Sequence, residues 1–372
     1  MMFWIPAILL GLAYFIFEFC TTQNWLRVII VTVLGFASMG IIIGIDYAAK
    51  TRATEVRSGY IEDWSHDEEW DEWIPPSTTC TTDSKGKQSC TTTPGYWVHH
   101  DAENHIKTTD DGWIYVSRTP DGRRMDDSFP NHKSELEKMF PYKTPTASTH
   151  AYTNKVQASY SIYKHPDIDL NKFPDLPKYP SEVQNYFYVD RIVGKVPNKM
   201  EALKVLAQKN TELNKMVPDP EKPGKKRSWK QVNLIFVNVG DKPEDYGFAL
   251  QDAWQGGNKN DFVVAFSMKK DGTLNWVYPF SWSEVEILKI EIRDFMMEQK
   301  EIKDFVPIVE KVSDMVADKF ERKQFEDFNY LHIEPSNGAL ITIWVMNILI
   351  GAIGVWFSVA YRHESYNNRR SF

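Results

Sequence analysis

Aspartates beside apolar runs are the residues of this chain best suited to chemistry. Asp190 ends the run YFYVD, and Asp261 opens the run DFVVAFSM after a Gly-Gly turn, with Asp245 and Asp252 between them. Carboxylate oxygens at strand ends suit Ca²⁺ or Mg²⁺, because a hard cation relieves the repulsion between neighbouring carboxylates. We therefore take Asp190 and Asp261 as a candidate metal site. The alternative is that these acids cap turns and face water.

Cys80 and Cys90 form a second candidate pair. They enclose TTDSKGKQS, whose Ser-Lys-Gly-Lys segment is typical of a hairpin turn and would bring the two thiols together. His99, His100 and His105 could join them as zinc ligands. However, adjacent histidines on a strand point to opposite faces, and the chain has no Cys-x-x-Cys pair. We expect a disulfide, with a Cys/His zinc site as the alternative.

A third candidate is the turn at residues 256–259, Gly-Gly-Asn-Lys, whose backbone N–H groups could cradle an anion. The alternative is that the glycines end a helix. The sequence contains no P-loop, nucleophile elbow, HExxH or Cys/His dyad. No motif therefore requires a cofactor, although calcium or magnesium is possible, and an enzyme is the less favoured reading.

The charge balance argues against nucleic acid as a partner. The chain has 43 basic and 50 acidic residues, a net charge of −7, whereas nucleic-acid binding needs a basic face. The basic segment PDPEKPGKKRSWK, residues 218–230, is therefore interpreted as a solvated loop. The 13 Trp, 17 Tyr and 21 Phe residues indicate a folded chain rather than a disordered one.

Three long apolar runs bracket the polar middle of the chain. They cover residues 2–19, 28–45 and 339–361, and a bilayer core needs roughly 20 apolar residues per helix. The first run lacks a basic n-region and a small-residue cleavage site, so a cleaved signal peptide is disfavoured. We predict a two-helix transmembrane hairpin in residues 1–47, a third transmembrane helix at residues 339–361, and a basic tail at residues 362–372.

The orientation of these spans depends on the cysteines. Lys and Arg near the span ends are almost balanced between the two sides, so the positive-inside rule decides little. Disulfides persist in oxidising compartments. We therefore predict a protein of the inner, cytoplasmic membrane, with the main domain and the N-terminus outside the cytoplasm and the tail inside.

The first part of the polar middle is expected to be β-rich. Residues 48–118 open with the acidic strip EDWSHDEEWDEW, interpreted as a solvated edge strand whose Trp residues share one face. Short β-branched and aromatic runs follow, separated by turn signals at Ser/Lys/Gly, at Asn104-His105 and at Asp-Asp-Gly. Residues 119–185 are rich in Pro and Tyr and predict an extended connector, with one strand or short helix at residues 150–163.

Residues 186–330 predict an α/β sandwich, because strand-like and helical patterns alternate. Ser283 with Glu286 forms a capping box at the start of one helix. Asp190 and Asp261 should lie at one end of the sheet, where open α/β sheets bind ligands. The expected strands are YFYVDRIV and residues 232–239, 261–268 and 273–278, and the expected helices are residues 198–215, 243–254, 283–299 and 307–328.

The order of elements in residues 186–325 resembles that of the TPM domain. Members of that family begin with a V-x-D-x-A-G-x-L segment followed by a helix. Residues 189–194, VDRIVG, precede the expected helix here, and Asp190 corresponds to the family's aspartate. The resemblance implies an extracytoplasmic α/β domain held by hydrophobic segments at one or both ends.

Later segments continue the resemblance with two departures. The family continues with a strand, a helix ending W-G-I-G-x-K and an apolar strand after D-N-G. The corresponding parts of this chain are residues 232–239, then Tyr246 and Leu250 with the segment WQGG, and then the segment KND. Phe262 stands where the glycine of D-N-G belongs, and residues 278–282, YPFSW, replace G-Y-G. The whole chain is also similar to uncharacterised membrane proteins of large tailed phages.

The family relation implies a role in maintaining membrane complexes, with some members acting as metal-dependent phosphatases and others as accessory subunits. We predict an integral membrane protein that presents a TPM-like domain as a non-enzymatic accessory or interaction module for envelope proteins. A divalent-metal-dependent phosphatase and a phage factor that modifies the host envelope, for example by superinfection exclusion, are the alternatives. The expected partners are the bilayer and other membrane or envelope proteins, and the oligomeric state stays open.

Overall fold

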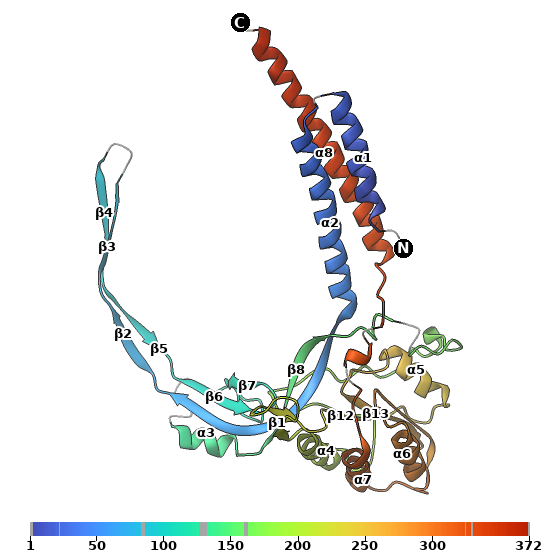
Figure 1. The fold of residues 1–372 in the computed structure, drawn as a ribbon. Coiled ribbons are helices and arrows are strands. Elements are labelled where there is room, and N and C mark those ends of the chain that lie inside the picture. Colours follow the sequence, from blue (N-terminus) through green and yellow to red (C-terminus); the bar gives the residue numbers. More distant parts are fainter. Residues whose placement is uncertain are drawn as a thin grey trace. The chain divides into compact units, whose positions relative to one another are not determined.

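The computed structural model describes residues 3–21, 23–82, 86–125, 132–159, 163–323, 325–328 and 330–370. The chain divides into two compact units. The helical unit contains residues 1–53, 151–162 and 324–372, and the α/β unit contains residues 54–150 and 163–323. Mixed α/β structure is therefore confirmed (Figure 1). The tip of the expected Cys hairpin, residues 83–85, and residues 160–162 of the expected strand or helix lie outside the described residues.

Apolar helices dominate the helical unit: α1 (Ile5–Cys20), α2 (Trp25–Thr51) and α8 (Asn337–Arg370). Pro6 sits in the first turn of α1, where its missing N–H costs no hydrogen bond. Asn24 caps α2 by accepting from a backbone N–H of its first turn. Two of these helices, α2 and α8, are long and apolar enough to span a membrane, whereas α1 is a shorter apolar helix of 16 residues. The expected basic tail continues α8 as far as its last described turn.

Glycines allow the three helices to approach one another closely. A Cβ at Gly35 of α2 would lie 2.8 Å from Oδ1 of Asn347 on α8. A Cβ at Gly354 of α8 would lie 2.9 Å from the ring of Tyr14 on α1. Small residues at helix contacts are the usual means of packing helices in a bilayer, where no hydrophobic force drives them together.

A buried polar cluster also joins these helices. The hydroxyl of Tyr14 lies 2.9 Å from both Oε1 of Glu18 and Oγ of Ser358, and all three residues are buried. Arg27 of α2 donates to Ser358 over 3.3 Å and stacks on the ring of Tyr361 at 4.6 Å. The cluster supplies each polar group with partners, which avoids the cost of burying them unpaired.

The first sheet of the α/β unit has the strand order β7-β6-β1-β8. It is formed by β1 (Arg52–Asp67), β6 (Glu103–Thr108), β7 (Gly112–Tyr115) and β8 (Pro145–Thr153). The helix α3 (Lys133–Met139) contributes to its apolar core. The core consists of buried side chains from these elements: Ile61, Ile106, Ile114, Val116, Met125, Leu136 and Phe140.

Two expectations about this region are wrong. The turn signal at Asn104-His105 lies inside β6, because Ile106 and alternate neighbours face the core and hold the segment in a strand. The Pro-rich connector is not extended throughout, since it contains the helix α3 and the short 3₁₀ turn η2 (Leu170–Lys172). Its strand β8 is extended, as expected. In β6, pairing with β1 and β7 overrides the local turn signal.

A long antiparallel ribbon continues from β1 and β6. Its next pair is β2 (Trp70–Ile74) with β5 (Tyr96–His100), and its last pair is β3 (Ser77–Thr82) with β4 (Gln88–Thr93). We call residues 70–100 the arm; in Figure 1 its strand pairs follow one another in a single ribbon. Every side chain of β3 and β4 is exposed, on both faces of the pair.

The second sheet has the order β14-β13-β12-β9. The strands β9 (Ile192–Val193), β12 (Asn233–Asn238) and β13 (Asp261–Met268) are parallel, and β14 (Leu274–Ser281) runs antiparallel to β13. Every residue of β12 and β13 is buried. Continuous apolar strands of this kind are typical of a sheet covered on both faces.

Helices cover both faces of this sheet. On one face, apolar residues of α4 (Lys199–Leu213), α6 (Ile287–Met297) and α7 (Val306–Lys319) pack on alternate residues of β12 and β13. On the other face, Leu250 of α5 (Asp245–Ala253) packs on the intervening residues. A short hairpin of β10 (Met216–Pro218) and β11 (Lys226–Ser228) occupies the segment expected to be a plain loop.

Three element boundaries differ from expectation. The run YFYVDRIV forms only the two-residue strand β9, because Tyr186 lies in a turn with positive φ. The expected capping box is absent: α6 begins at Ile287, and the Ser283 hydroxyl donates instead to the carbonyl of Glu321. The last helix ends at Lys319 because Phe320 has extended backbone, and η3 (Phe325–Phe328) follows as a separate turn.

Candidate functional site

The structure separates Asp190 from Asp261. Asp190 precedes β9 and Asp261 opens β13, with β12 lying between these two strands. Both therefore lie at the amino ends of the parallel strands, whereas open α/β sheets bind ligands at the carboxyl ends. Asp190 forms an ion pair with Lys199 at 2.7 Å. Neither aspartate belongs to a group of three or more possible metal ligands among the described residues, and the calcium or magnesium hypothesis stays a prediction.

Protein donors occupy both carboxylate oxygens of Asp261. It accepts from Asn233 Nδ2 at 2.9 Å, from the Tyr179 hydroxyl at 3.0 Å and from the backbone N–H of Asn258 at 2.8 Å. Burial raises the pKa of Asp261 to about 6, against the lowering effect of these hydrogen bonds. Asn233 also accepts from Arg191 Nε at 2.7 Å, so one amide links a buried cation to a buried acid.

The other two aspartates are also separate. Asp252, on α5, accepts from the backbone N–H and the ring Nδ1 of His165, the latter at 2.7 Å. Its carboxylate is buried, so it holds residues 163–165 against α5. Asp245 lies in the exposed first turn of α5. The expectation that these acids face water therefore holds for Asp245 and is wrong for Asp252, which is buried against His165.

The Gly-Gly turn does not offer its backbone to an anion. The N–H groups of Gly256 and Gly257 donate to carbonyl oxygens at the end of α5, at 2.8 and 2.9 Å, and that of Asn258 donates to Asp261. Gly256 and Gly257 have positive φ, as residues that end a helix commonly do. Lys259, the last residue of this turn, is instead one of the residues that line a pocket.

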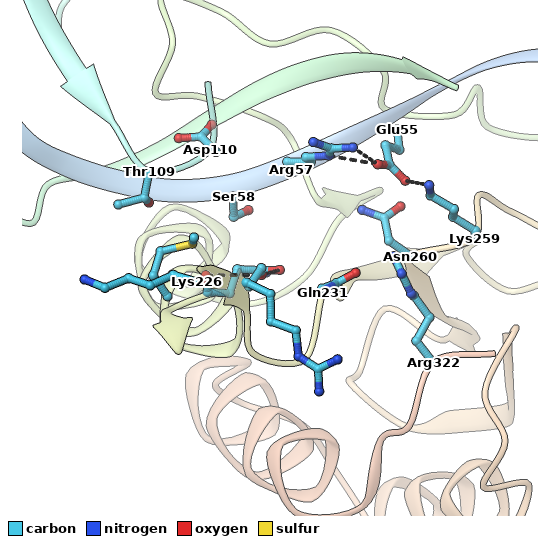
Figure 2. A pocket seen from close by; sticks show the side chains of 14 residues that line it. Glu55, Arg57, Ser58, Thr109, Asp110, Lys226, Gln231, Lys259, Asn260 and Arg322 are labelled. Carbon is cyan, nitrogen blue, oxygen red and sulfur yellow. Dashed lines mark hydrogen bonds and ion pairs between the residues drawn. The ribbon is translucent and has the colours of Figure 1, made fainter. Parts of the chain in front are cut away.

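We call this cavity of about 330 Å³ the basic pocket (Figure 2). Its walls come from β1, the β6–β7 turn, the β10–β11 hairpin, the turn before β13 and the segment after α7. Five cationic and two acidic side chains are among the residues that line it. These residues are Glu55, Arg57, Ser58, Thr109, Asp110, Asn214, Met216, Lys226, Arg227, Ser228, Gln231, Lys259, Asn260 and Arg322.

The inner wall of the basic pocket is a cluster of cations around one buried acid. Glu55 is 2% exposed and forms ion pairs with Arg57 at 2.7 Å and with Lys259 at 3.6 Å. Burial lowers the pKa of Lys259; the Glu55 charge opposes this shift, and the charges of Arg322 and Arg57 add to it. Figure 2 shows these side chains and Asn260 gathered on one side of the pocket. The local balance is therefore positive, in a chain that is acidic overall.

A second cavity of about 790 Å³ lies at the carboxyl ends of β9, β12 and β13. Gly194 follows β9 with a φ of +90°, and a Cβ there would lie 2.2 Å from the carbonyl oxygen of Asn238. Only glycine fits this close approach of two strand ends. Both lysines and acids line the cavity: Lys195, Lys269, Lys270, Lys303, Asp241, Asp271 and Glu301.

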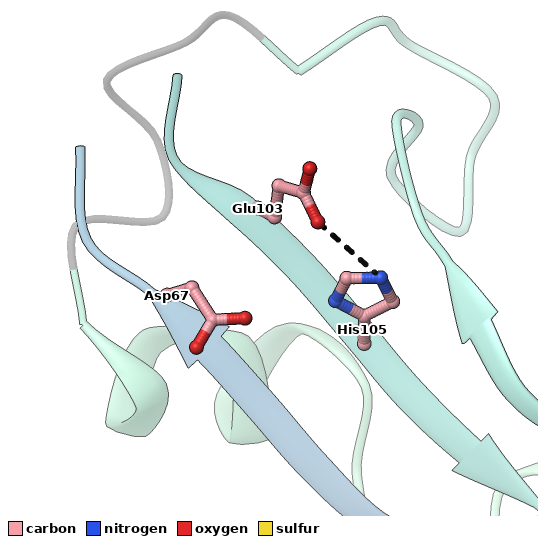
Figure 3. A group of neighbouring side chains, drawn as sticks. All are labelled: Asp67, Glu103 and His105. Atoms are coloured by element: carbon pink, nitrogen blue, oxygen red, sulfur yellow. Dashed lines mark ion pairs between the residues drawn. The ribbon is translucent and has the colours of Figure 1, made fainter. Parts of the chain in front are cut away.

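Asp67, Glu103 and His105 form the group among the described residues whose ligand atoms could share a metal ion (Figure 3). Asp67 and Glu103 face each other across the β1–β6 pair, and His105 lies 3.8 Å from Glu103. Both acids are exposed, and exposed acidic groups of this kind are common without an ion. His99 and His100 point to opposite faces, as expected, and pair with Asp71 and Glu72.

The arm carries a disulfide and an exposed aromatic cluster. Cys80 and Cys90 face each other in the β3–β4 register and are joined by a disulfide bond. Trp73 lies opposite Trp97, and Trp70 stacks on His100 at 4.3 Å. The expectation that the Trp residues share one face is wrong, because Trp70 and Trp73 are three positions apart on a strand of period two.

No protein-family model, curated protein or solved structure matches this chain. The resemblance to the TPM domain therefore stays a hypothesis that rests on residues and element order. Sequence reasoning did not find the basic pocket, because Arg57, Lys226 and Arg322 come from distant segments. Its local signals in the sequence are the basic segment at residues 218–230 and the turn that contains Lys259, which lie about 30 residues apart.

Proposed function

We propose that this protein is an integral membrane protein whose α/β unit serves, outside the cytoplasm, as a non-enzymatic interaction module for another envelope protein. The observation that carries this proposal is the arm. A two-stranded ribbon is marginally stable alone, yet here it is exposed on both faces. Trp70, Trp73, Tyr96 and Trp97 each expose about half of the side chain or more, and exposed apolar clusters of this kind mark interaction sites.

The charge beside these aromatics favours a basic partner surface. Residues 67–72, DEEWDE, place five acids next to the aromatic cluster. Lys and Arg side chains complement such a surface and also stack on Trp faces. The partner we propose is therefore a protein whose contact surface presents Lys and Arg among apolar residues. The disulfide holds the end of the arm in shape without a hydrophobic core.

The membrane placement extends this proposal to three spans. The 16 residues of α1 give a helix of about 24 Å, shorter than the roughly 30 Å bilayer core. Two observations support α1 as a third span. It packs on α2 and α8 through contacts that contain glycines, and the polar cluster joins all three helices. Local thinning of the bilayer accommodates a mismatch of this size.

The fold of the second sheet supports a TPM-like domain as part of the proposal. Three parallel strands, one antiparallel strand and helices on both faces follow the order of elements on which the resemblance rests. A phosphatase would need grouped oxygen ligands at Asp190 and Asp261, and no observation favours that alternative. A phage factor acting on the host envelope is one form that the interaction role could take.

Photocrosslinking in intact membranes tests the role of the arm. The full chain carries p-benzoylphenylalanine in place of Tyr96, and the control carries it in place of Tyr142, an exposed aromatic outside the arm. We expect a single adduct from position 96 that position 142 does not give. Mass spectrometry should map it to a peptide rich in Lys or Arg. An adduct with a second copy of the chain, or no adduct specific to position 96, contradicts the proposal.

A charge variant makes this test specific. Glu68→Lys with Glu69→Lys reverses two exposed acids between β1 and β2. We expect the position 96 adduct to fall several-fold, because rim charges guide association. The matched change Glu244→Lys with Glu284→Lys on exposed positions outside the arm should leave the adduct unchanged. Equal losses in both variants would show that the adduct does not depend on the acidic strip.

A further inference from the structure

The basic pocket has features that the proposed interaction role does not use. Arg57, Lys259 and Arg322 converge on a wall that holds a single buried acid, Glu55 (Figure 2). Lys226 and Arg227 add two more cations from the β10–β11 hairpin. Cations that are brought together from separate elements repel one another, so their convergence costs free energy unless an anion offsets it.

The type of cation indicates the type of anion. Three of the five are arginines, whose planar guanidinium groups bind phosphate or carboxylate in bidentate geometry. The pocket has an excess of three positive charges over Glu55 and Asp110. A phosphomonoester carries close to two negative charges near pH 7, and so matches this excess better than a single carboxylate.

Two further atoms indicate what the anion is attached to. Oδ1 of Asn260 and Oδ2 of Asp110 are buried atoms of pocket-lining residues, and neither has a hydrogen-bond partner in the described part of the chain. Asn260 is 5% exposed, and its amide nitrogen already donates to the carbonyl of Val56. Buried acceptors without donors are costly, and hydroxyl groups of a ligand would supply donors.

We propose that the basic pocket binds a phosphomonoester that carries hydroxyl groups, such as a glycerol or sugar phosphate. The phosphate lies among Arg57, Lys259 and Arg322, and the hydroxyl groups donate to Asn260 and Asp110. The cavity of about 330 Å³ is at the lower end of the range for small-molecule sites and suits a ligand of this size. Such a ligand could be free in solution or could be the headgroup of a lipid such as lysophosphatidate, which keeps one glycerol hydroxyl beside its phosphomonoester.

Calorimetry with the full chain in nanodiscs of phosphatidylcholine tests the proposal. We expect glycerol 3-phosphate to bind, inorganic phosphate to bind more weakly, and glycerol to give no heat. If lysophosphatidate in the nanodisc raises the melting temperature and removes the heat of glycerol 3-phosphate, the lipid competes for the same pocket. If neither glycerol 3-phosphate nor inorganic phosphate binds at millimolar concentration, the proposal is wrong.

Variants locate the binding. Arg322→Gln removes one guanidinium from the inner wall and should weaken glycerol 3-phosphate about tenfold or more, as expected for a lost charge-assisted hydrogen bond. Arg227→Gln changes an exposed rim residue, is compatible with folding, and should weaken binding by a smaller factor. Arg293→Gln on α6 is the matched control, because Arg293 pairs with Asp294 and does not line the pocket. Unchanged affinity in both pocket variants would overturn the proposal.

Discussion

The guanidinium of Arg191 donates from Nε to Oδ1 of Asn233 over 2.7 Å, and the same amide donates from Nδ2 to Asp261. Arg191 also donates to the hydroxyl of Ser58 on β1 at 2.8 Å. This buried chain of hydrogen bonds therefore links the two sheets of the α/β unit. Burial lowers the pKa of Arg191 to about 10, so the guanidinium stays charged at neutral pH and needs these acceptors.

We predict that Asn233→Ala destabilises the protein by about 2–4 kcal/mol, because it leaves a buried cation and a buried acid without their shared partner. Thermal unfolding of the detergent-solubilised full chain measures the change. Asn171→Ala, at an exposed position of η2, is the control and should stay within about 0.5 kcal/mol of the wild type. Equal melting temperatures for the two variants would show that the Asn233 bridge contributes little.

Asp261 should make stability depend on pH in a definite direction. Its pKa is raised from 3.8 to about 6 in the folded chain, so the folded state holds the proton more tightly than the unfolded state does. The stabilisation from this group is complete below pH 3.8 and is lost as the pH rises through about 6. The shift corresponds to about 3 kcal/mol.

Comparison with Asp261→Asn isolates this contribution from other titrating groups. We expect the unfolding free energy of the wild type, minus that of the variant, to fall as the pH rises from about 4 to about 7. Unfolding of the full chain at a series of pH values gives the difference. A difference that is flat or that rises over this range would contradict the raised pKa.

The sequence predicted the elements whose patterns are long and apolar. Residues 261–268 form a strand as expected, because every residue of DFVVAFSM is buried between two layers of helices. The helix at residues 198–215 was also found within two residues of its ends, since Leu203, Leu206 and Leu213 mark its buried face. Patterns of this length leave few alternatives.

Local signals failed where distant residues decide the structure. Ser283 and Glu286 have the spacing of a capping box, but the Ser283 hydroxyl donates to the carbonyl of Glu321, which no local pattern reveals. The basic pocket was missed for the same reason, because Arg57 and Arg322 are brought together only by the fold. Conversely, Asp190 and Asp261 looked alike in sequence, but the sheet order places β12 between their strands.

The disulfide should stabilise the arm and leave the second sheet unchanged. A crosslink that closes a loop of this size contributes about 2–3 kcal/mol in the chain-entropy model. The double variant Cys80→Ala with Cys90→Ala should therefore raise the rate of amide exchange in β3 and β4, because all their side chains are exposed and no buried core holds these strands together. Exchange in β12 and β13 serves as the internal control. Mass mapping that finds two free thiols, or stoichiometric zinc, in the wild-type chain would contradict the pairing.

The disulfide also predicts the side of the membrane on which the α/β unit lies. Alkaline phosphatase is active only outside the cytoplasm, so a fusion after Lys215 should be active, and a fusion after the last turn of α8 should be inactive. An inactive fusion at Lys215 would reverse the orientation.

The number of spans decides where the N-terminus lies. Three spans place it outside, whereas two spans, α2 and α8 alone, place it inside. An N-terminal epitope tag should thus be reached by antibody in spheroplasts without lysis. A tag reached only after lysis, with that fusion active, would instead remove α1 from the spans and keep the α/β unit outside.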